Sequence, residues 1–156
     1  MLVRRICPEE FAAEAFSGAG GLRHGARWHS KGVRIVYTSG SLSLAALEFF
    51  VNLDRGAAGG PLVAVSAEIP DSVKIRSVAP ADLPSDWRAY PAPKSVQEIG
   101  SRWAERAESA VLAVPSVLIP VERNYLLNPV HRDFSRIVAG KPEAFTFDSR
   151  MWKPRA

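Results

Sequence analysis

A strongly apolar run over residues 42–53, with the sequence LSLAALEFFVNL, constrains the fold of this chain more than any other feature. The run is rich in leucine and alanine, which favours a buried helix over a strand. Glu48 lies in the middle of the run and is the only charged residue between Arg34 and Asp54. Because an unpaired carboxylate is costly to bury, Glu48 must either reach solvent or have a polar partner.

The spacing of polar residues supports the solvent alternative equally well. On a helix, residues three, four or seven positions apart share a face. One such stripe, which could simply face water, consists of Ser41, Glu48, Asn52 and Arg55. The pattern alone therefore leaves open whether Glu48 is a functional or a solvated residue.

The other signals along the chain mix strands and helices without a regular βαβ alternation. Alternating or β-branched apolar runs predict strands over residues 2–6, 33–38, 61–69, 73–78, 110–115, 116–120 and 144–148. Helices are predicted from Pro8 to the glycines at 18–21, over 42–53, over 95–109 and near 133–138. Turn residues at 70–72 predict a hairpin between the strands 61–69 and 73–78. The proline-rich segment 80–93 is predicted to be a loop that covers a site or binds a partner, or that packs on the core.

This order of elements predicts an α+β fold in which a mixed sheet forms the core and helices flank it. A chain of 156 residues is within the range of one domain, and we expect residues 1–156 to form a single domain. No glycine-rich phosphate-binding motif follows a strand. A nucleotide, if bound, is therefore held in another way.

Charge and cysteine content limit the functional classes. The net charge of +4 suits an anionic ligand, a nucleic acid or an acidic protein. Basic side chains concentrate in residues 23–34, where a solvated basic loop is the alternative reading. The only cysteine, Cys7, excludes an internal disulfide and fits a reducing compartment. With no signal-peptide pattern and no membrane-spanning run, we expect a cytoplasmic protein without a membrane segment.

Arg27 and Tyr37 are polar residues that flank or belong to the predicted strand 33–38. Arg27 lies in the segment GARWHSKG, where glycines allow close approach of a ligand and the guanidinium can bind a phosphate or carboxylate; a surface salt bridge is the alternative. Tyr37 shares a strand face with Val33 and Ile35, so it is either a half-buried core aromatic or a ring that stacks on a flat ligand. Ser116 has no GxSxG context, which argues against a serine-hydrolase nucleophile.

Histidines offer a different chemistry, for which the spacing gives little support. His24 and His29 are five residues apart, which fits poorly with a helical metal site, and no cysteine or carboxylate lies between them. We predict no metal. A basic nucleic-acid-binding or RNA-cleaving protein that uses His24, His29 and His131 stays open as a second hypothesis. A third hypothesis treats the basic loop as a non-enzymatic docking surface for an acidic partner.

Three segments together resemble the RES domain, a family named after an arginine, a glutamate and a serine. The segments are GARWHSKGVRIVYTSGSLSLAALE, PSVLIP and ERNYLLNPVH, and the resemblance extends over nearly the whole chain. Arg27, Tyr37 and Glu48 have the family order and spacing, and Ser116 and the Asn128–Pro129 pair supply the later elements. His29 departs from the pattern, because the family often has asparagine there.

The resemblance implies a toxin of a type II toxin–antitoxin pair, neutralised by an antitoxin with an Xre-like domain. It also implies a fold similar to diphtheria-toxin-like ADP-ribosyltransferases, with NAD as the substrate and no metal. Such a toxin degrades NAD or transfers ADP-ribose to a target, forms a homodimer within its antitoxin complex and is not expected to bind DNA directly.

The resemblance also assigns the site residues. Arg27, Tyr37 and Glu48 are the expected catalytic residues, and the expected NAD-binding residues are Arg27, Trp28, Tyr37, Glu48, Ser116 and Asn128. Glu48 would hold the nicotinamide ribose and stabilise developing positive charge, Arg27 would bind the pyrophosphate or ribose, and Tyr37 would stack on nicotinamide. Ser116 would hydrogen-bond the NAD molecule.

Overall fold

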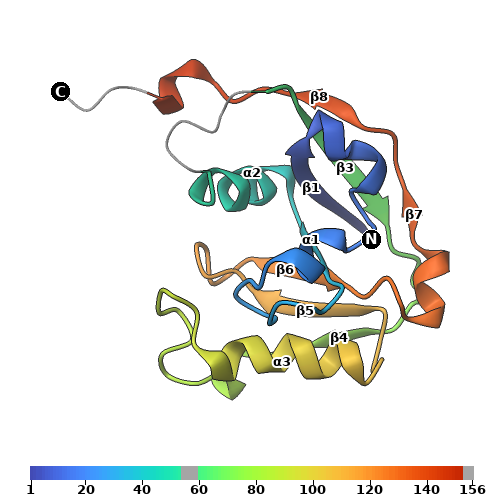
Figure 1. Cartoon of the computed structure of the whole chain (residues 1–156), viewed down its shortest axis with the longest axis vertical. Helices are drawn as coiled ribbons and strands as arrows, with labels where there is room; N and C mark the ends of the chain where they lie inside the picture. Colours follow the sequence, from blue (N-terminus) through green and yellow to red (C-terminus); the bar gives the residue numbers. More distant parts are fainter. Residues whose placement is uncertain (54–59, 153–156) are drawn as a thin grey trace.

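A curled sheet forms the centre of the computed structural model, which describes residues 1–53 and 60–152 (Figure 1). Its strands are β1 (Leu2–Pro8), β2 (Val36–Ser39), β3 (Leu62–Glu68), β4 (Ile75–Ser77), β5 (Val111–Pro115), β6 (Arg123–Leu127), β7 (Val138–Ala139) and β8 (Glu143–Phe145). The strand order is β4-β5-β6-β2-β1-β3-β7, and β8 also pairs with β3. Among the described strands, β4 and β5 pair in parallel and the other pairs are antiparallel. The predicted α+β fold with a mixed sheet is confirmed.

The helices flank this sheet. They are α1 (Ala19–Arg23), α2 (Leu42–Val51) and α3 (Lys94–Glu105), with short 3-10 helices η1 (Glu9–Glu14), η2 (Pro80–Asp82), η3 (Arg132–Arg136) and η4 (Ser149–Trp152). Figure 1 shows α3 alongside the β4–β5 part of the sheet, whereas α2 lies between that part and the β1–β3 part. No helix within the described residues is long and apolar enough to cross a membrane.

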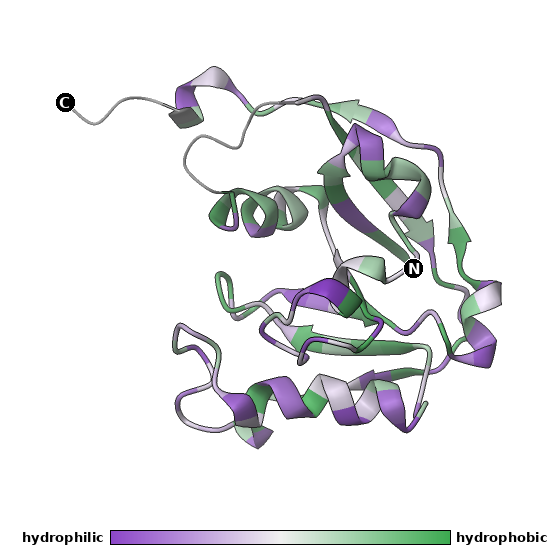
Figure 2. Cartoon of the chain, viewed as in Figure 1, coloured by the Kyte–Doolittle hydropathy of each residue, from purple (hydrophilic) through white to green (hydrophobic). Residues whose placement is uncertain are grey.

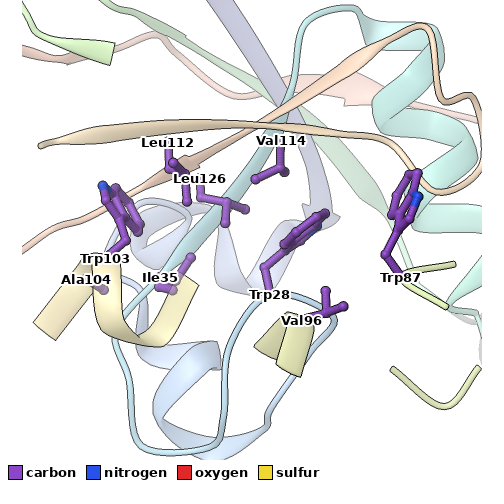
Figure 3. Packing of buried hydrophobic residues seen from close by; sticks show 9 residues of the cluster. All are labelled: Trp28, Ile35, Trp87, Val96, Trp103, Ala104, Leu112, Val114 and Leu126. Carbon is purple, nitrogen blue, oxygen red and sulfur yellow. The ribbon is translucent and has the colours of Figure 1, made fainter. Parts of the chain in front are cut away.

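Three tryptophans pack in the core that joins α3 to the sheet. Trp103 and Val96 come from α3, Trp28 and Trp87 come from loops, and all four side chains are buried (Figure 3). They pack against the apolar faces of β5 and β6. This core fixes the backbone on both sides of Trp28, and therefore also the position of Arg27.

The run over residues 42–53 forms a helix, as predicted, but α2 is only partly buried. Ser41 caps its N-terminus, because its Oγ accepts a hydrogen bond from the backbone N–H of Leu44 at 3.1 Å. Leu44 and Ala45 are buried, whereas Leu47 is 40% exposed and Val51 is 58% exposed. Figure 2 shows that most residues along this helix are apolar. The prediction of a helix is confirmed and that of its burial is only partly right, because α2 packs against β1 and β2 and leaves its outer face exposed.

The predicted hairpin over residues 61–78 was also wrong. β3 pairs with β1, whereas β4 crosses to the opposite edge of the sheet and pairs in parallel with β5. Turn residues at 70–72 reverse or redirect the chain but do not decide which strand it joins next. The predicted turn is present, but β3 and β4 do not pair with each other.

Several other boundaries differ from the predictions. The predicted strand 116–120 is a turn, and the strand that follows it, β6, was not predicted. The predicted strand 33–38 begins only at Val36. The predicted first helix is the 3-10 helix η1. A separate helix, α1, begins after Gly18, whose positive φ of 71° turns the chain between the two helices. The predicted helix 95–109 corresponds to α3, and the predicted strand 144–148 overlaps β8.

Candidate active site

Glu48 on α2 faces the end of the sheet and is held there by two side chains from distant parts of the sequence. Its Oε1 accepts a hydrogen bond from Ser116 Oγ at 2.8 Å and another from Asn124 Nδ2 at 2.6 Å. Glu48 is half-buried. The carboxylate therefore has polar partners and is not simply a member of a solvated stripe. Arg55, the last residue of that predicted stripe, lies outside the described residues.

Ser116 uses its full hydrogen-bonding capacity within the protein. It follows β5 and is completely buried. Its hydroxyl donates to Glu48, and its oxygen accepts from the backbone N–H groups of Leu118 and Ile119, both at 3.1 Å. A hydroxyl has one donor hydrogen and two acceptor lone pairs, so none is left for a ligand. The structure brings Ser116 to Glu48, as a partner of the carboxylate.

Asn124 on β6 is a site residue that the sequence analysis did not identify. Ser39, at the end of β2, is its direct register partner, and Ser39 Oγ donates to Asn124 Oδ1 at 2.7 Å. Both residues are buried. The ERNYLLNP segment contains Asn124, but only the pairing of β2 with β6 places this amide beside Glu48.

Tyr37 on β2 is half-buried, and its hydroxyl is tied to the loop that carries Arg27. The hydroxyl oxygen accepts a hydrogen bond from the backbone N–H of Trp28 at 3.2 Å and lies 2.8 Å from His29 Nδ1. Burial raises the pKa of Tyr37 well above its ordinary value of 10.0. The hydroxyl is therefore neutral at physiological pH and serves to fix the loop, which leaves the ring as the part able to contact a ligand.

Arg27 lies in that loop and contacts the proline-rich segment 80–93. Its Nη1 donates to the carbonyl oxygens of Trp87 at 2.8 Å and Ala89 at 3.0 Å. In the described part of the chain, no partner is found for its Nε or Nη2. Arg27 can therefore bind an anion with these groups while it holds the segment in place.

Arg27 and Tyr37 lie close enough to the Glu48 carboxylate for its charge to influence their pKa values. Burial lowers the pKa of Arg27, and the negative charges of Glu48 and of an ionised Tyr37 oppose that shift. For Tyr37, the nearby Arg27 lowers the pKa and Glu48 raises it, although burial has the largest effect. The three residues expected to be catalytic therefore share one electrostatic environment.

Trp28 and Asn128 occupy structural positions. The Trp28 side chain is 2% exposed and packs in the tryptophan core, where its ring centroid is 6.3 Å from that of Trp87 (Figure 3). Asn128 is fully buried beyond the end of β6, and its Nδ2 donates to the carbonyl oxygen of Ala104 at 3.0 Å. The structure does not bring either side chain to the Glu48 carboxylate.

The three histidine side chains have different surroundings. His29 is buried against Tyr37, His24 is exposed at the end of α1, and His131 caps η3 through its Nδ1, which accepts from the backbone N–H of Asp133. Within the described residues, no group of three metal-ligating side chains could hold a metal ion. The three histidines therefore do not form a common site in the described structure.

Comparisons with known proteins place the chain in one family. The model of the RES domain matches residues 2–148. A protein of Yersinia enterocolitica named Toxin Res is 37% identical over 152 residues, which cover 97% of this chain and 99% of that protein. The Prs ADP-ribosylating toxin of a Sphingobium species is 41% identical over 145 residues, which cover 90% of this chain and 89% of that protein.

A solved structure shows the same fold at low sequence identity. It is the crystal structure of the M. tuberculosis MbcT-MbcA toxin-antitoxin complex, in which one chain superposes with a TM-score of 0.73 at 13% identity, covering 93% of this chain and 84% of that chain. Together with the match over residues 2–148, the comparisons show that this chain belongs to the RES domain family.

Proposed function

We propose that this protein is the toxin of a toxin–antitoxin system and that it consumes NAD by cleaving the bond between nicotinamide and ribose. The observation that carries this proposal is the Glu48 carboxylate, which is held through one oxygen beside Arg27 and Tyr37. Relatives of similar length named Toxin Res and Prs ADP-ribosylating toxin support the assignment.

A single carboxylate suits this reaction. When the bond between the ribose C1′ and the nicotinamide nitrogen breaks, both electrons move to nicotinamide, which leaves as a neutral molecule. The positive charge moves to the ribose, so the transition state resembles an oxocarbenium ion. No acid is needed to protonate the leaving group, in contrast to ordinary glycosidases, which use two carboxyl groups.

The geometry supports distinct roles for the three residues. Glu48 would bind a hydroxyl of the nicotinamide ribose and stabilise the positive charge as it develops. Arg27 would bind the pyrophosphate through its Nε and Nη2, since Nη1 is bonded to the segment 80–93. The ring of Tyr37 would stack on nicotinamide, because its hydroxyl is engaged with the Arg27 loop.

The acceptor of ADP-ribose completes the reaction. It attacks C1′ through a lone pair and loses a proton. The name of the Sphingobium relative supports transfer of ADP-ribose to a target, whereas water or phosphate as acceptor would make the protein an NAD-degrading enzyme. Incubation with NAD labelled in its adenosine part and a cell extract separates these cases, because the label ends in a protein band, in free ADP-ribose or in a phosphorylated product.

An antitoxin is the proposed partner, and the structural neighbour solved as a toxin–antitoxin complex supports it. We further propose that the antitoxin is Xre-like, that the toxin forms a homodimer within the complex and that both act in the cytoplasm. An antitoxin that blocks the Glu48 site should prevent NAD binding. A purified complex that binds NAD as tightly as the free toxin would contradict this mode of inhibition.

Expression in a bacterial host tests the proposed function. The wild-type protein should arrest growth and lower the cellular NAD level, whereas Glu48→Ala and Arg27→Ala variants that remain folded should do neither. Arg34→Ala is a matched control, because Arg34 is an exposed arginine that bonds only the carbonyl oxygen of Ser17 in the described structure. A folded Glu48→Ala variant that still arrests growth and depletes NAD would refute the proposal.

A further inference from the structure

We infer that Asn124, fixed in orientation by Ser39, is a positioning residue that acts with Ser116 to hold Glu48 by Oε1 and leaves Oε2 as the single oxygen that meets the substrate. This inference rests on the proposed function and assigns roles to Asn124 and Ser39.

The hydrogen bonds to Glu48 are one-sided. Both side-chain donors, Ser116 Oγ and Asn124 Nδ2, converge on Oε1, at 2.8 Å and 2.6 Å. Within the described residues, no donor or cation is paired with Oε2. A carboxylate that binds a substrate must keep an acceptor oxygen available. In this arrangement Oε1 fixes the side chain and Oε2 is left to meet the substrate.

The orientation of the Asn124 amide follows from its two neighbours. An ionised carboxylate only accepts hydrogen bonds, so the amide must present Nδ2 to Glu48. Oδ1 then faces Ser39, whose hydroxyl can donate, and the 2.7 Å distance fits this bond. The reverse orientation would place the amide oxygen against the carboxylate. Ser39 therefore selects the amide orientation that stabilises Glu48.

Strand pairing makes this arrangement rigid. Ser39 and Asn124 are direct register partners on β2 and β6, and Asn124 also pairs with Val114 on β5. Ser116 lies two residues beyond Val114, and its own hydroxyl is fixed by two backbone N–H groups. Three strands thus hold the donors before a substrate arrives. Such preorganised groups need no rearrangement when charge develops in the transition state.

A positioning role differs from substrate contact in its kinetic effect. Removing a hydrogen bond that holds Glu48 should reduce kcat for nicotinamide release by about 10- to 100-fold, the range expected for one hydrogen bond to a charged group. The KM for NAD should change by less than about threefold, since no ground-state contact is lost. We expect this pattern in Asn124→Ala and, to a smaller extent, in Ser39→Ala.

Asn124→Asp provides a second variant of nearly the same shape. It replaces the donating amide by a carboxyl group beside Oε1, so it should lose at least as much kcat as Asn124→Ala. Asn52→Ala is the matched control, because Asn52 is an exposed asparagine whose Nδ2 contacts the backbone carbonyl of Glu48 at 2.8 Å and not its carboxylate. Its kcat should stay within about twofold of the wild type.

A double-mutant cycle with an NAD-binding readout tests the inference most sharply. Calorimetry with NAD should give the same Kd for Glu48→Ala and for Glu48→Ala combined with Asn124→Ala, because Asn124 acts only through Glu48. A further loss of NAD affinity in the double variant, or full kcat in folded Asn124→Asp, would overturn the inference while the proposed function stands. A wild-type protein that neither binds NAD nor releases nicotinamide would overturn the proposed function and this inference with it.

Discussion

His29 is a buried imidazole at the base of the Arg27 loop, and its surroundings couple folding to pH. Its Nδ1 lies against the Tyr37 hydroxyl. Burial lowers the pKa of His29 below its ordinary value of 6.5, and the nearby carbonyls of Gly21 and His24 only partly oppose this shift. At pH values between the folded and unfolded pKa, His29 is therefore neutral in the folded protein and protonated in the unfolded chain.

This shift predicts a loss of stability in mild acid. Because the unfolded state binds more protons, the free energy of unfolding should fall as the pH drops below 6.5 toward the lower pKa of the folded state. In His29→Asn this part of the dependence should disappear. Urea unfolding between pH 7.5 and 5 measures it. His24→Asn, at an exposed histidine, is the control. A steep acid loss that persists unchanged in His29→Asn would contradict this assignment.

The sequence identified some site residues and missed others for a physical reason. Glu48 is conspicuous because it is a lone charge in an apolar helix, and Arg27 and Tyr37 were recognised by the family pattern. Asn124 and Ser39 are ordinary polar residues in their local sequence. Their importance arises only from the pairing of β2 with β6, which joins positions 85 residues apart. No local pattern contains this information.

At the scale of elements, α3 supports the Arg27 loop through an unusually close approach. Gly100 lies in the middle of α3 and faces the backbone of Trp28, where an added Cβ would overlap the Trp28 carbonyl oxygen. Gln97 and Ser101 on the same helix bond the backbone of Ala26 and Ser30, at 3.0 Å and 2.9 Å. One face of α3 therefore holds the loop on both sides of Arg27.

Gly100→Ala tests this support. Alanine normally stabilises a helix interior by about 1 kcal/mol relative to glycine. At this position the overlap should dominate and lower the free energy of unfolding by about 1–3 kcal/mol, as in other overpacked cores. Gly20→Ala in α1 is the matched control, because nothing lies within 4 Å of its added Cβ. Chemical denaturation of both variants measures the difference, and equal stability of the two would contradict the close packing.

The positions of the helices and strands were predicted better than the pairing between strands. The helix signals over 42–53 and 95–109 led to α2 and α3, because periodicity and composition act within one element. The hairpin over residues 61–78 failed because β4 pairs with β5, more than 30 residues away along the chain. Turn residues specify a change of direction, whereas strand pairing depends on the whole sheet.

At the scale of the whole molecule, the curled sheet gathers a site from five separate segments. The loop before β2 contributes Arg27, β2 contributes Tyr37, α2 contributes Glu48, the turn after β5 contributes Ser116 and β6 contributes Asn124. β2 and β6 are neighbours near the middle of the strand order, so the site lies in the central part of the sheet. This placement is consistent with a reaction that depends on prearranged charge.

The central claim is that Glu48 acts on the nicotinamide–ribose bond. Its most direct test is the release of nicotinamide from NAD labelled in its nicotinamide part. The rates of the purified wild-type protein and of Glu48→Gln are compared with and without cell extract. This variant keeps an acceptor oxygen for Ser116 and Asn124 but replaces the free carboxylate oxygen by an amide nitrogen. We predict release by the wild type and a loss of about 100-fold or more in folded Glu48→Gln. Equal rates for the two proteins, or no release by the wild type in either condition, would contradict the claim.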